Sequence, residues 1–459
     1  MYNIHFDTPN HVHFIGIGGI SMSGLAEVLL REGFTVSGSD MTRSALTEKL
    51  SDMGALISYP QSAENITPDI DLVVYTAAIS EDNPEYAAAK SASLPMLPRA
   101  EVLGQIMANY RVSVAVSGTH GKTTTTSMLS HILLKAGADP TISVGGMLSA
   151  IGGNIRVGKS DTFLTEACEY TNSFLHLYPK YTIILNIEAD HLDFFKDIYE
   201  IRDSFRRFAL QTAPEGAVII NGDIDAYHEI TAGTPASVIT FGMNENSLFH
   251  PKNIVFEEKA NCAFDAYKGT VLLGHVRLNV PGLHNVSNAL SAIALSDALG
   301  IPFTQTVSAL LSFHGTDRRF EYKGTYRGAA VIDDYAHHPS EITATLSAAM
   351  RYPHKKLIVV FQPHTYSRTA ALLEDFGTAL SAADLVILPD IYAAREKNTI
   401  GISSDAVRRQ IEAHGTKALY IPEFSDIENY LSEIVSEGDL LITMGAGTVY
   451  KIGENLVSH

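Results

Sequence analysis

A glycine-rich run in the middle of the chain has the residue types of a phosphate-binding loop. It consists of Gly118, Thr119, His120, Gly121, Lys122, Thr123 and Thr124, and it lies between a predicted strand and a predicted helix. At such a junction, backbone N–H groups and the helix N-terminus converge on a phosphate, while the lysine reaches the outer phosphates and the threonine can hold Mg²⁺. The full pattern requires glycine where Val116 stands, so we predict a shortened ATP-binding loop. A glycine turn with a surface lysine is the alternative reading.

Acidic residues and a histidine follow two further predicted strands. Glu166 ends one apolar run, and Asp190 and His191 follow the next. Because the carboxyl ends of parallel strands meet at one edge of a sheet, we expect these side chains to lie near the loop and, with Thr123, to bind magnesium. Each one taken alone is more often a solvated loop residue. Three nearby acids are alternatives: Glu169, Glu188 and Asp193.

A second glycine turn lies near the N-terminus, after another apolar run. Gly16, Gly18 and Gly19 resemble the dinucleotide-binding pattern, although Ser21 occupies the position of its last glycine. Asp40 follows Gly18 by 40 − 18 = 22 residues, close to the spacing at which a dinucleotide fold places its ribose-binding acid. We therefore expect a pyrophosphate ligand, and the residues do not single out NAD.

Three polar residues between positions 285 and 319 are further candidates for contact with ATP. Asn285 begins an alanine-rich helix and has the donor and acceptor groups needed to contact adenine, but a helix cap is an equally good interpretation. Arg318 and Arg319 lie at a predicted domain boundary, where a guanidinium can reach a γ-phosphate. As surface charges they would have no such role.

Polar residues also end three predicted strands of the last region. They are Asp333, Asp334, Tyr335, His337 and His338 after the first, Gln362, His364 and Arg368 after the second, and Asp390, Tyr392 and Arg395 after the third. Three such loops at one sheet edge predict a binding site in which Arg368 or Arg395 holds a small carboxylate.

The elements that must position these residues form three stretches in which short apolar runs alternate with amphipathic segments. This pattern predicts an α/β fold with parallel sheets flanked by helices. We expect three domains: a Rossmann-like domain at 1–107, a phosphate-loop ATPase domain at 108–316 and a Rossmann-like domain at 317–459. Residues 244–280 predict a small antiparallel insertion.

The composition and net charge argue against several classes of protein. The 459 residues are 46% apolar and carry 33 Lys and Arg against 51 Asp and Glu, a net charge of −18, which argues against a nucleic-acid partner. Two cysteines, Cys168 and Cys262, cannot form a disulfide framework, and we see neither a long apolar run nor a leader. We expect a cytoplasmic protein without membrane insertion; the oligomeric state is not specified by the sequence.

The chain resembles the Mur ligase family over nearly its whole length. The matching runs are HFIGIGGISMSGLA, VSGSD, GTHGKTTTT, TEACEY, NIEADHLDFF, PGLHNVSNALSAIAL, RRFEYKG, VIDDYAHHPSEI, VFQPHTYSRT, DIYAARE and TMGAGTVYKIGE. This resemblance implies an ATP-dependent ligase that joins L-alanine to the carboxylate of UDP-N-acetylmuramic acid through an acyl phosphate, in peptidoglycan precursor synthesis. Its substrates would be ATP, the UDP-sugar and L-alanine, with Mg²⁺ as cofactor.

The resemblance also implies roles for single residues. Gly16, Gly18, Gly19 and Asp40 would bind the UDP-sugar; Lys122 and Thr123 the ATP phosphates and magnesium; Glu166 and His191 the metal; Asn285 the adenine; Arg319 the γ-phosphate; His337 and Arg368 the L-alanine. We also assign Asp334 to the ATP site and consider His337 as the base that deprotonates the alanine ammonium.

Some positions depart from the family pattern. Ser21 stands where many relatives have glycine, and Thr365 stands where some have arginine, which favours Arg368 as the carboxylate ligand. Arg206 and Arg207 occur where a carbamoylated lysine would be required, so we do not predict that modification. Three rival functions are a ligase that adds a preformed peptide to the same UDP-sugar, a nicotinamide-dependent oxidoreductase and a nucleotide switch.

Overall fold

The computed structural model describes residues 2–76, 79–192, 194–394 and 396–458. The chain folds into two compact units, one formed by the chain up to Leu248 together with Ser291–Thr306, the other by Phe249–Leu290 and the chain from Val307 onward. Two of the predicted site candidates, Asp193 and Arg395, lie outside the described residues.

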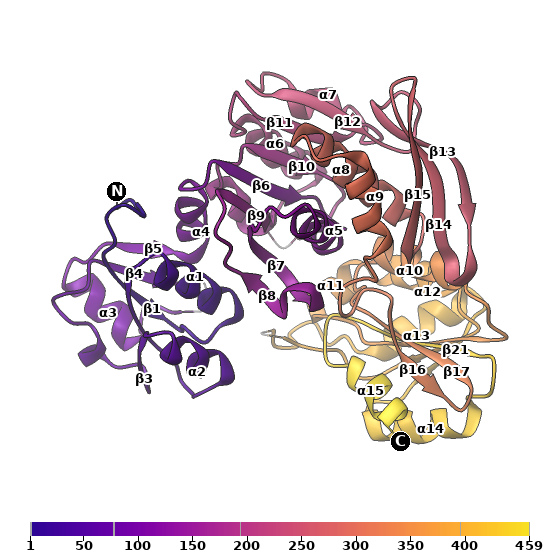
Figure 1. Cartoon of the computed structure of the whole chain (residues 1–459). Helices are drawn as coiled ribbons and strands as arrows, with labels where there is room; N and C mark the ends of the chain where they lie inside the picture. The colour runs from indigo at the N-terminus through magenta and orange to yellow at the C-terminus, as the bar shows by residue number, and fades with distance from the viewer. Residues whose placement is uncertain (1, 77–78, 193, 395, 459) are drawn as a thin grey trace. The chain divides into compact units, whose positions relative to one another are not determined.

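The first sheet of the first unit is parallel, with strand order β3-β2-β1-β4-β5 (Figure 1). Its strands are β1 (His11–Ile15), β2 (Thr35–Ser39), β3 (Leu56–Ser58), β4 (Leu72–Tyr75) and β5 (Met96–Pro98), and its helices are α1 (Ile20–Arg31), α2 (Ala45–Asp52), α3 (Pro84–Ser91) and α4 (Arg99–Met107). The strand order reverses at β1, which is where open α/β sheets bind their ligands. The first glycine turn follows this strand.

The second sheet of this unit has the order β12-β11-β10-β6-β9-β7-β8, and all its pairs are parallel except β7 with β8. Its elements are β6 (Val112–Ser117), α5 (Lys122–Lys135), β7 (Thr141–Leu148), β8 (Gly153–Arg156), β9 (Thr162–Glu166), β10 (Tyr181–Ile184), α6 (Ile198–Leu210), β11 (Ala217–Asn221), α7 (Tyr227–Thr231) and β12 (Ser237–Phe241). Because β6 lies between β9 and β10, the loop after β6 is flanked by the residues that follow both neighbours.

The second unit contains the predicted insertion and the last sheet. The insertion is antiparallel, as expected: β13 (Phe249–Phe256), β14 (Asn261–Lys268) and β15 (Val271–Pro281) pair in sequence order. Helices α8 (His284–Ala298) and α9 (Phe303–Leu311) follow, and their segment Ser291–Thr306 belongs to the first unit. The last sheet has the order β16-β17-β21-β18-β19-β20. Its elements are β16 (Glu321–Tyr326), β17 (Ala329–Asp334), α10 (Pro339–Ala349), β18 (Leu357–Phe361), α11 (Tyr366–Ala371), α12 (Leu373–Leu380), β19 (Leu385–Leu388), α13 (Ser404–Ala413), β20 (Lys417–Tyr420), α14 (Phe424–Ile434), β21 (Leu440–Met444) and α15 (Tyr450–Ser458).

The strands of the last sheet are continuous apolar runs because both faces of this sheet are buried. Along β18, Leu357 and Val359 pack into the core on one face, whereas Ile358 and Val360 pack into the core on the other. Helices α10, α12 and α13 contribute to the first core, and α14 and α15 to the second. Both faces are therefore buried, as is usual for parallel strands, and the predicted α/β fold class is confirmed.

Two further properties follow from the described residues. Within them, no helix combines the length and the apolar character needed to cross a lipid bilayer. Cys168 is an exposed free thiol and Cys262 is a buried one.

Candidate active site

The N-terminal glycine turn is held by the end of β2. The backbone N–H groups of Gly16 and Ile17 both donate to the carbonyl oxygen of Ser39, each at 2.9 Å, and the N–H of Gly18 donates to a carboxylate oxygen of Asp40 at 2.8 Å. A Cβ on Gly18 would lie only 2.7 Å from that oxygen, so any other residue here would force Asp40 or the turn to shift. Asp40 therefore shapes the turn itself, and its contact with the UDP-sugar remains a prediction.

Helix α1 leaves its N-terminus available to a ligand. Its N-cap is Gly19, and within the described residues no side chain accepts a hydrogen bond from its first N–H groups. Gly19 and Ile20 are exposed. Since the first N–H groups of a helix and its dipole favour an anion, this end of α1 suits a diphosphate.

The central glycine loop is fixed by its glycines and by one asparagine. Gly118 has a φ of +142°, and a Cβ there would lie 2.9 Å from the Cβ of Leu185, while Gly121 adopts a left-handed conformation as the N-cap of α5. Asn186, just after β10, accepts from the N–H of His120 at 2.8 Å and donates to the His120 carbonyl at 3.0 Å. The predicted loop lies at the junction of β6 and α5, where these contacts hold its backbone.

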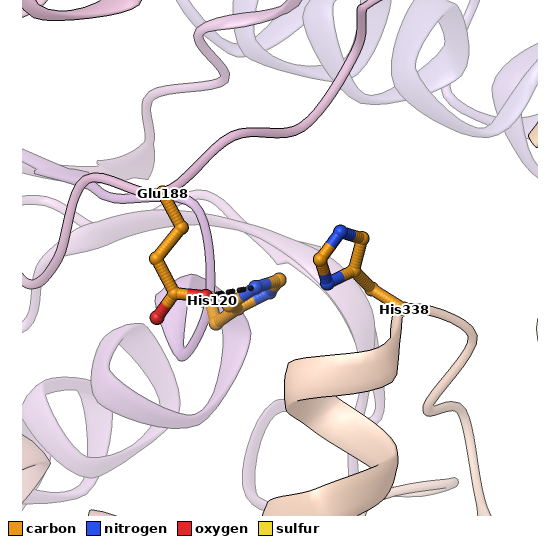
Figure 2. Close-up of side chains that lie close together, drawn as sticks. All are labelled: His120, Glu188 and His338. Carbon is orange, nitrogen blue, oxygen red and sulfur yellow. Dashed lines mark ion pairs between the residues drawn. The ribbon is translucent and has the colours of Figure 1, made fainter. Parts of the chain in front are cut away.

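Two more loop side chains meet Glu188. The Thr119 hydroxyl accepts from the Glu188 N–H at 2.9 Å, and His120 Nε2 lies 3.4 Å from a Glu188 carboxylate oxygen (Figure 2). Thr124 lies in the first turn of α5 and is partly exposed. Glu188 was predicted only as an alternative metal ligand, and in the structure it contacts Thr119 and His120 of the loop.

Lys122 is the first residue of α5, and its ammonium group lies back over the loop. It donates to the carbonyls of Gly118 and Thr119 and lies 3.0 Å from Glu169, a buried carboxylate. Burial favours the neutral amine, but the nearby negative charges, chiefly that of Glu169, outweigh burial and raise the pKa of Lys122. The lysine is therefore charged, and its contact with the ATP phosphates remains a prediction.

Glu166 is the last residue of β9 and meets the helix that follows the loop. Its carboxylate accepts from the Thr123 hydroxyl at 3.2 Å and from the N–H of Gly145 at 2.6 Å. A Cβ on Gly145 would lie 2.7 Å from the carboxylate, so glycine there allows its close approach. The structure thus brings Thr123 and Glu166 together as the sequence predicted.

His191 lies on the other side of the same loop system. Its Nε2 is 3.7 Å from Asp190 and 4.0 Å from Glu169, and its ring stacks on Tyr170 with centroids 4.4 Å apart. Glu169 therefore contacts both Lys122 and His191. Glu169 was predicted only as an alternative acid, although it is the carboxylate that links the predicted phosphate-binding lysine to the predicted metal-binding histidine.

In the second unit, Asn285 is engaged within its own turn. Its amide donates to the Pro281 carbonyl at 2.8 Å and accepts from Asn288 at 3.0 Å. Asn285 is the second residue of α8, and these two contacts are with a preceding carbonyl and a side-chain amide, whereas an N-cap would accept from backbone N–H groups of the helix. The two contacts fix the orientation of the amide, and its contact with adenine remains a prediction.

The adjacent arginines have different surroundings. Arg318 donates to Asp333 at 3.0 Å and to the Gly445 and Gly447 carbonyls, and its guanidinium lies over the rings of Tyr335 and Tyr450. Three of the five N–H donors of Arg318 therefore hold the loops of the last sheet together.

Arg319 has looser partners. It lies 3.8 Å from Glu341 and over the ring of Tyr335. Asp334 accepts from the N–H groups of Phe320 and Ala336, and burial, partly offset by the charge of Arg319, raises the pKa of Asp334 to about 6. Of the two arginines, Arg319 is the better candidate for a γ-phosphate.

His337 and Arg368 come together around a third residue, His364. The His337 and His364 ring centroids are 5.8 Å apart, and Arg368 Nη1 lies 3.2 Å from His364 Nδ1. Burial, followed by the charges of His337 and Arg368, lowers the pKa of His364 to about 4, so its ring is neutral and accepts from Arg368. His337 Nδ1 lies 3.1 Å from the carbonyl oxygen of Tyr335.

Comparison with family models matches most of the chain. Residues 11–111 match the model described as Mur ligase family, catalytic domain; residues 116–296 match the Mur ligase middle domain; and residues 318–447 match the Mur ligase, glutamate ligase domain.

Individual proteins are also similar over their full length. The chain is 61% identical over 457 residues to the UDP-N-acetylmuramate–L-alanine ligase of Agathobacter rectalis and 56% identical over 458 residues to that of Lachnospira eligens, covering 100% of each chain in both cases. Among solved structures, the UDP-N-acetylmuramate-alanine ligase of Thermotoga maritima aligns with a TM-score of 0.80 and 29% identity over 98% of both chains. A murein peptide ligase of Psychrobacter arcticus shares the fold, with a TM-score of 0.70 and 24% identity over 98% of both chains.

Proposed function

This chain belongs to the Mur ligase family, and from that premise we propose that it uses ATP to join L-alanine to the carboxylate of UDP-N-acetylmuramic acid. The observation that carries this proposal is the 61% identity, along the whole chain, to a ligase named for these substrates. The reaction belongs to peptidoglycan precursor synthesis, and we assign it to the cytoplasm, where ATP and nucleotide sugars occur.

The chemistry answers a leaving-group problem. A carboxylate resists attack by an amine because its oxygen leaves poorly, so the UDP-sugar carboxylate first attacks the γ-phosphorus of ATP, and ADP departs. The L-alanine amine then attacks the acyl phosphate, and phosphate leaves as the amide bond forms. Lys122, held at the loop, and Arg319 have the charge needed to stabilise the phosphoryl oxygens during the first step.

Magnesium fits the residues around the loop. The Thr123 hydroxyl and the Glu166 carboxylate are 3.2 Å apart and are hard oxygen donors of the kind Mg²⁺ prefers. His191, beside the acids Asp190 and Glu169, adds a nitrogen donor to the proposed ligand set. When bound, the ion would neutralise phosphate charge.

We assign the L-alanine site to His337 and Arg368. A guanidinium binds a small carboxylate through paired N–H groups, and Arg368 is oriented by its contact with His364. Because Nδ1 of His337 faces the Tyr335 carbonyl, a neutral ring carries its hydrogen on Nδ1 and has its basic nitrogen at Nε2. That nitrogen is our proposed acceptor for the ammonium proton of L-alanine.

A phosphate-release assay tests the proposal. With ATP, Mg²⁺ and UDP-N-acetylmuramic acid present, L-alanine should give rapid release, glycine and L-serine slower release, and a tripeptide none. Equal release with and without an amino acid would contradict ligation. Release with the tripeptide alone would favour the peptide-adding rival, which the relatives at 50 to 61% identity do not support.

A further inference from the structure

Glu85 is a buried carboxylate to which none of the roles above applies. It lies in the first turn of α3, and its side chain is fully buried. One oxygen accepts from the Asn65 amide at 2.6 Å and from the Ser62 N–H at 3.3 Å. The other accepts from the Ser39 hydroxyl and lies 3.6 Å from Nε2 of His13. A buried charge with this many donors is held in a single position.

Ser39 connects this carboxylate to the N-terminal glycine turn. It is the last residue of β2 and is fully buried. Its hydroxyl bonds the carboxylate, while its backbone carbonyl accepts from the N–H groups of Gly16 and Ile17. The next residue, Asp40, accepts from the N–H of Gly18. The position of Ser39 thus sets the position of the turn.

A row of hydrogen-bonding groups continues from Glu85 to the surface. His13 Nδ1 lies 2.9 Å from the Ser37 hydroxyl, which lies 2.8 Å from His11 Nε2, and His11 Nδ1 lies 2.9 Å from Asp69. This row connects His13, which lies beside Glu85, to Asp69, whose side chain is exposed.

We propose that Glu85 is a positioning residue for the UDP diphosphate: through Ser39 it fixes the turn Gly16–Gly19 in the conformation that presents backbone N–H groups to the ligand. This inference rests on the proposed function, because it assumes that the turn binds the UDP-sugar. Glu85 itself is buried behind the turn and contacts no substrate. Its effect is on substrate affinity.

Three variants separate positioning from general stability. Glu85→Gln keeps the size of the side chain but removes its charge and one acceptor, and Ser39→Ala removes the hydroxyl link. Glu27→Gln is the matched control: Glu27 is 4% exposed, lies on α1, and is bonded to Lys49 at 2.7 Å and Arg31 at 3.2 Å, so it is a buried carboxylate whose bonds join α1 and α2.

The measurements are the calorimetric affinity for UDP, the KM for each substrate, kcat and the melting temperature of the full-length protein. We expect Glu85→Gln to weaken UDP binding and raise the KM for UDP-N-acetylmuramic acid about tenfold, with kcat and the KM for ATP changed less than about twofold. Ser39→Ala should shift the same two values in the same direction. Glu27→Gln should lower the melting temperature without changing UDP affinity.

The outcomes are distinct. Unchanged UDP affinity in Glu85→Gln, or an equal loss in Glu27→Gln, overturns the positioning role alone. If Glu85→Gln does not fold, Ser39→Ala decides by the same criterion. Failure of the unmodified protein to bind UDP overturns the proposed function and this inference together.

Discussion

Two glycine turns of the first unit join a strand to a helix at the point where a sheet reverses its order, yet they differ in their side chains. At Gly16–Gly19 the nearby carboxylate, Asp40, accepts from the turn's own backbone, and α1 begins with Ile20. At Gly118–Gly121 the helix begins with Lys122 and Thr123, each bonded to a carboxylate. We therefore propose that the same backbone arrangement serves two purposes: the first turn binds a diphosphate, and the second adds the charges that phosphoryl transfer requires.

We expect the largest effect from removing Lys122, the charged residue that only the second turn has. We expect Lys122→Ala to lower kcat/KM for ATP roughly 10³-fold, because it removes the charge that stabilises the transferring phosphoryl group. UDP affinity at the first turn should remain unchanged, as measured by calorimetry. Lys135→Ala, at the other end of α5, is the control. A loss of UDP affinity as large as the loss of ATP turnover would mean that the turns do not act separately.

We assign the magnesium site to the second glycine turn only. Glu166→Gln should raise the Mg²⁺ concentration for half-maximal activity by about tenfold to hundredfold, since it removes a charged ligand. A titration of activity against Mg²⁺ measures the shift, with the exposed Glu215→Gln as the matched control. An unaltered titration curve would remove Glu166 from the proposed ligands.

A smaller effect should be confined to the first turn. In Gly18→Ala the new Cβ would lie 2.7 Å from Asp40 and 2.9 Å from Thr47, so the turn must shift. We expect the KM for UDP-N-acetylmuramic acid to rise about tenfold while the KM for ATP is retained. Gly153→Ala, whose Cβ would approach no atom closer than 4.0 Å, is the control. A rise in the KM for ATP instead would contradict the assignment of the two turns.

The smallest expected effect is on the way the melting temperature depends on pH. Burial opposes ionisation of Glu85, but donors from His13, Ser39 and Asn65 outweigh it and hold its pKa below 4.5. A carboxylate with a lowered folded-state pKa contributes stability above its unfolded pKa, and this stability is lost as pH falls through the folded pKa. The melting temperature of Glu85→Gln should therefore lie below that of the unmodified protein at pH 7, and the gap should narrow below pH 4.5. A constant gap from pH 7 to pH 3 would contradict this.

Patterns of sequence predicted the framework of both turns well. The apolar run before the first glycine turn is the strand β1, and the loop after β6 and the antiparallel insertion lie where they were predicted. These features depend on the spacing of apolar residues and on glycines at strand ends, and both are local properties of the sequence. The structure confirms that Glu166 ends β9 beside the loop.

Other parts of the site depend on backbone directions that residue types do not reveal. Glu169 precedes a turn in which Thr171 and Asn172 have positive φ, and the path of this segment brings Glu169 to Lys122. Asn186 lies beyond β10, which ends at Ile184, and its side chain holds the loop; no motif in the sequence marks this role. Arg318 has a φ of +61°, so it and its neighbour reach different partners.

Transfer of an oxygen isotope shows whether the UDP-sugar carboxylate is activated as an acyl phosphate. UDP-N-acetylmuramic acid labelled with ¹⁸O in its carboxylate is incubated with ATP, Mg²⁺, L-alanine and the protein, and the released phosphate is examined by ³¹P NMR. Activation through an acyl phosphate predicts one ¹⁸O atom in each phosphate released. Phosphate free of the label, with the amide product still formed, would contradict the account.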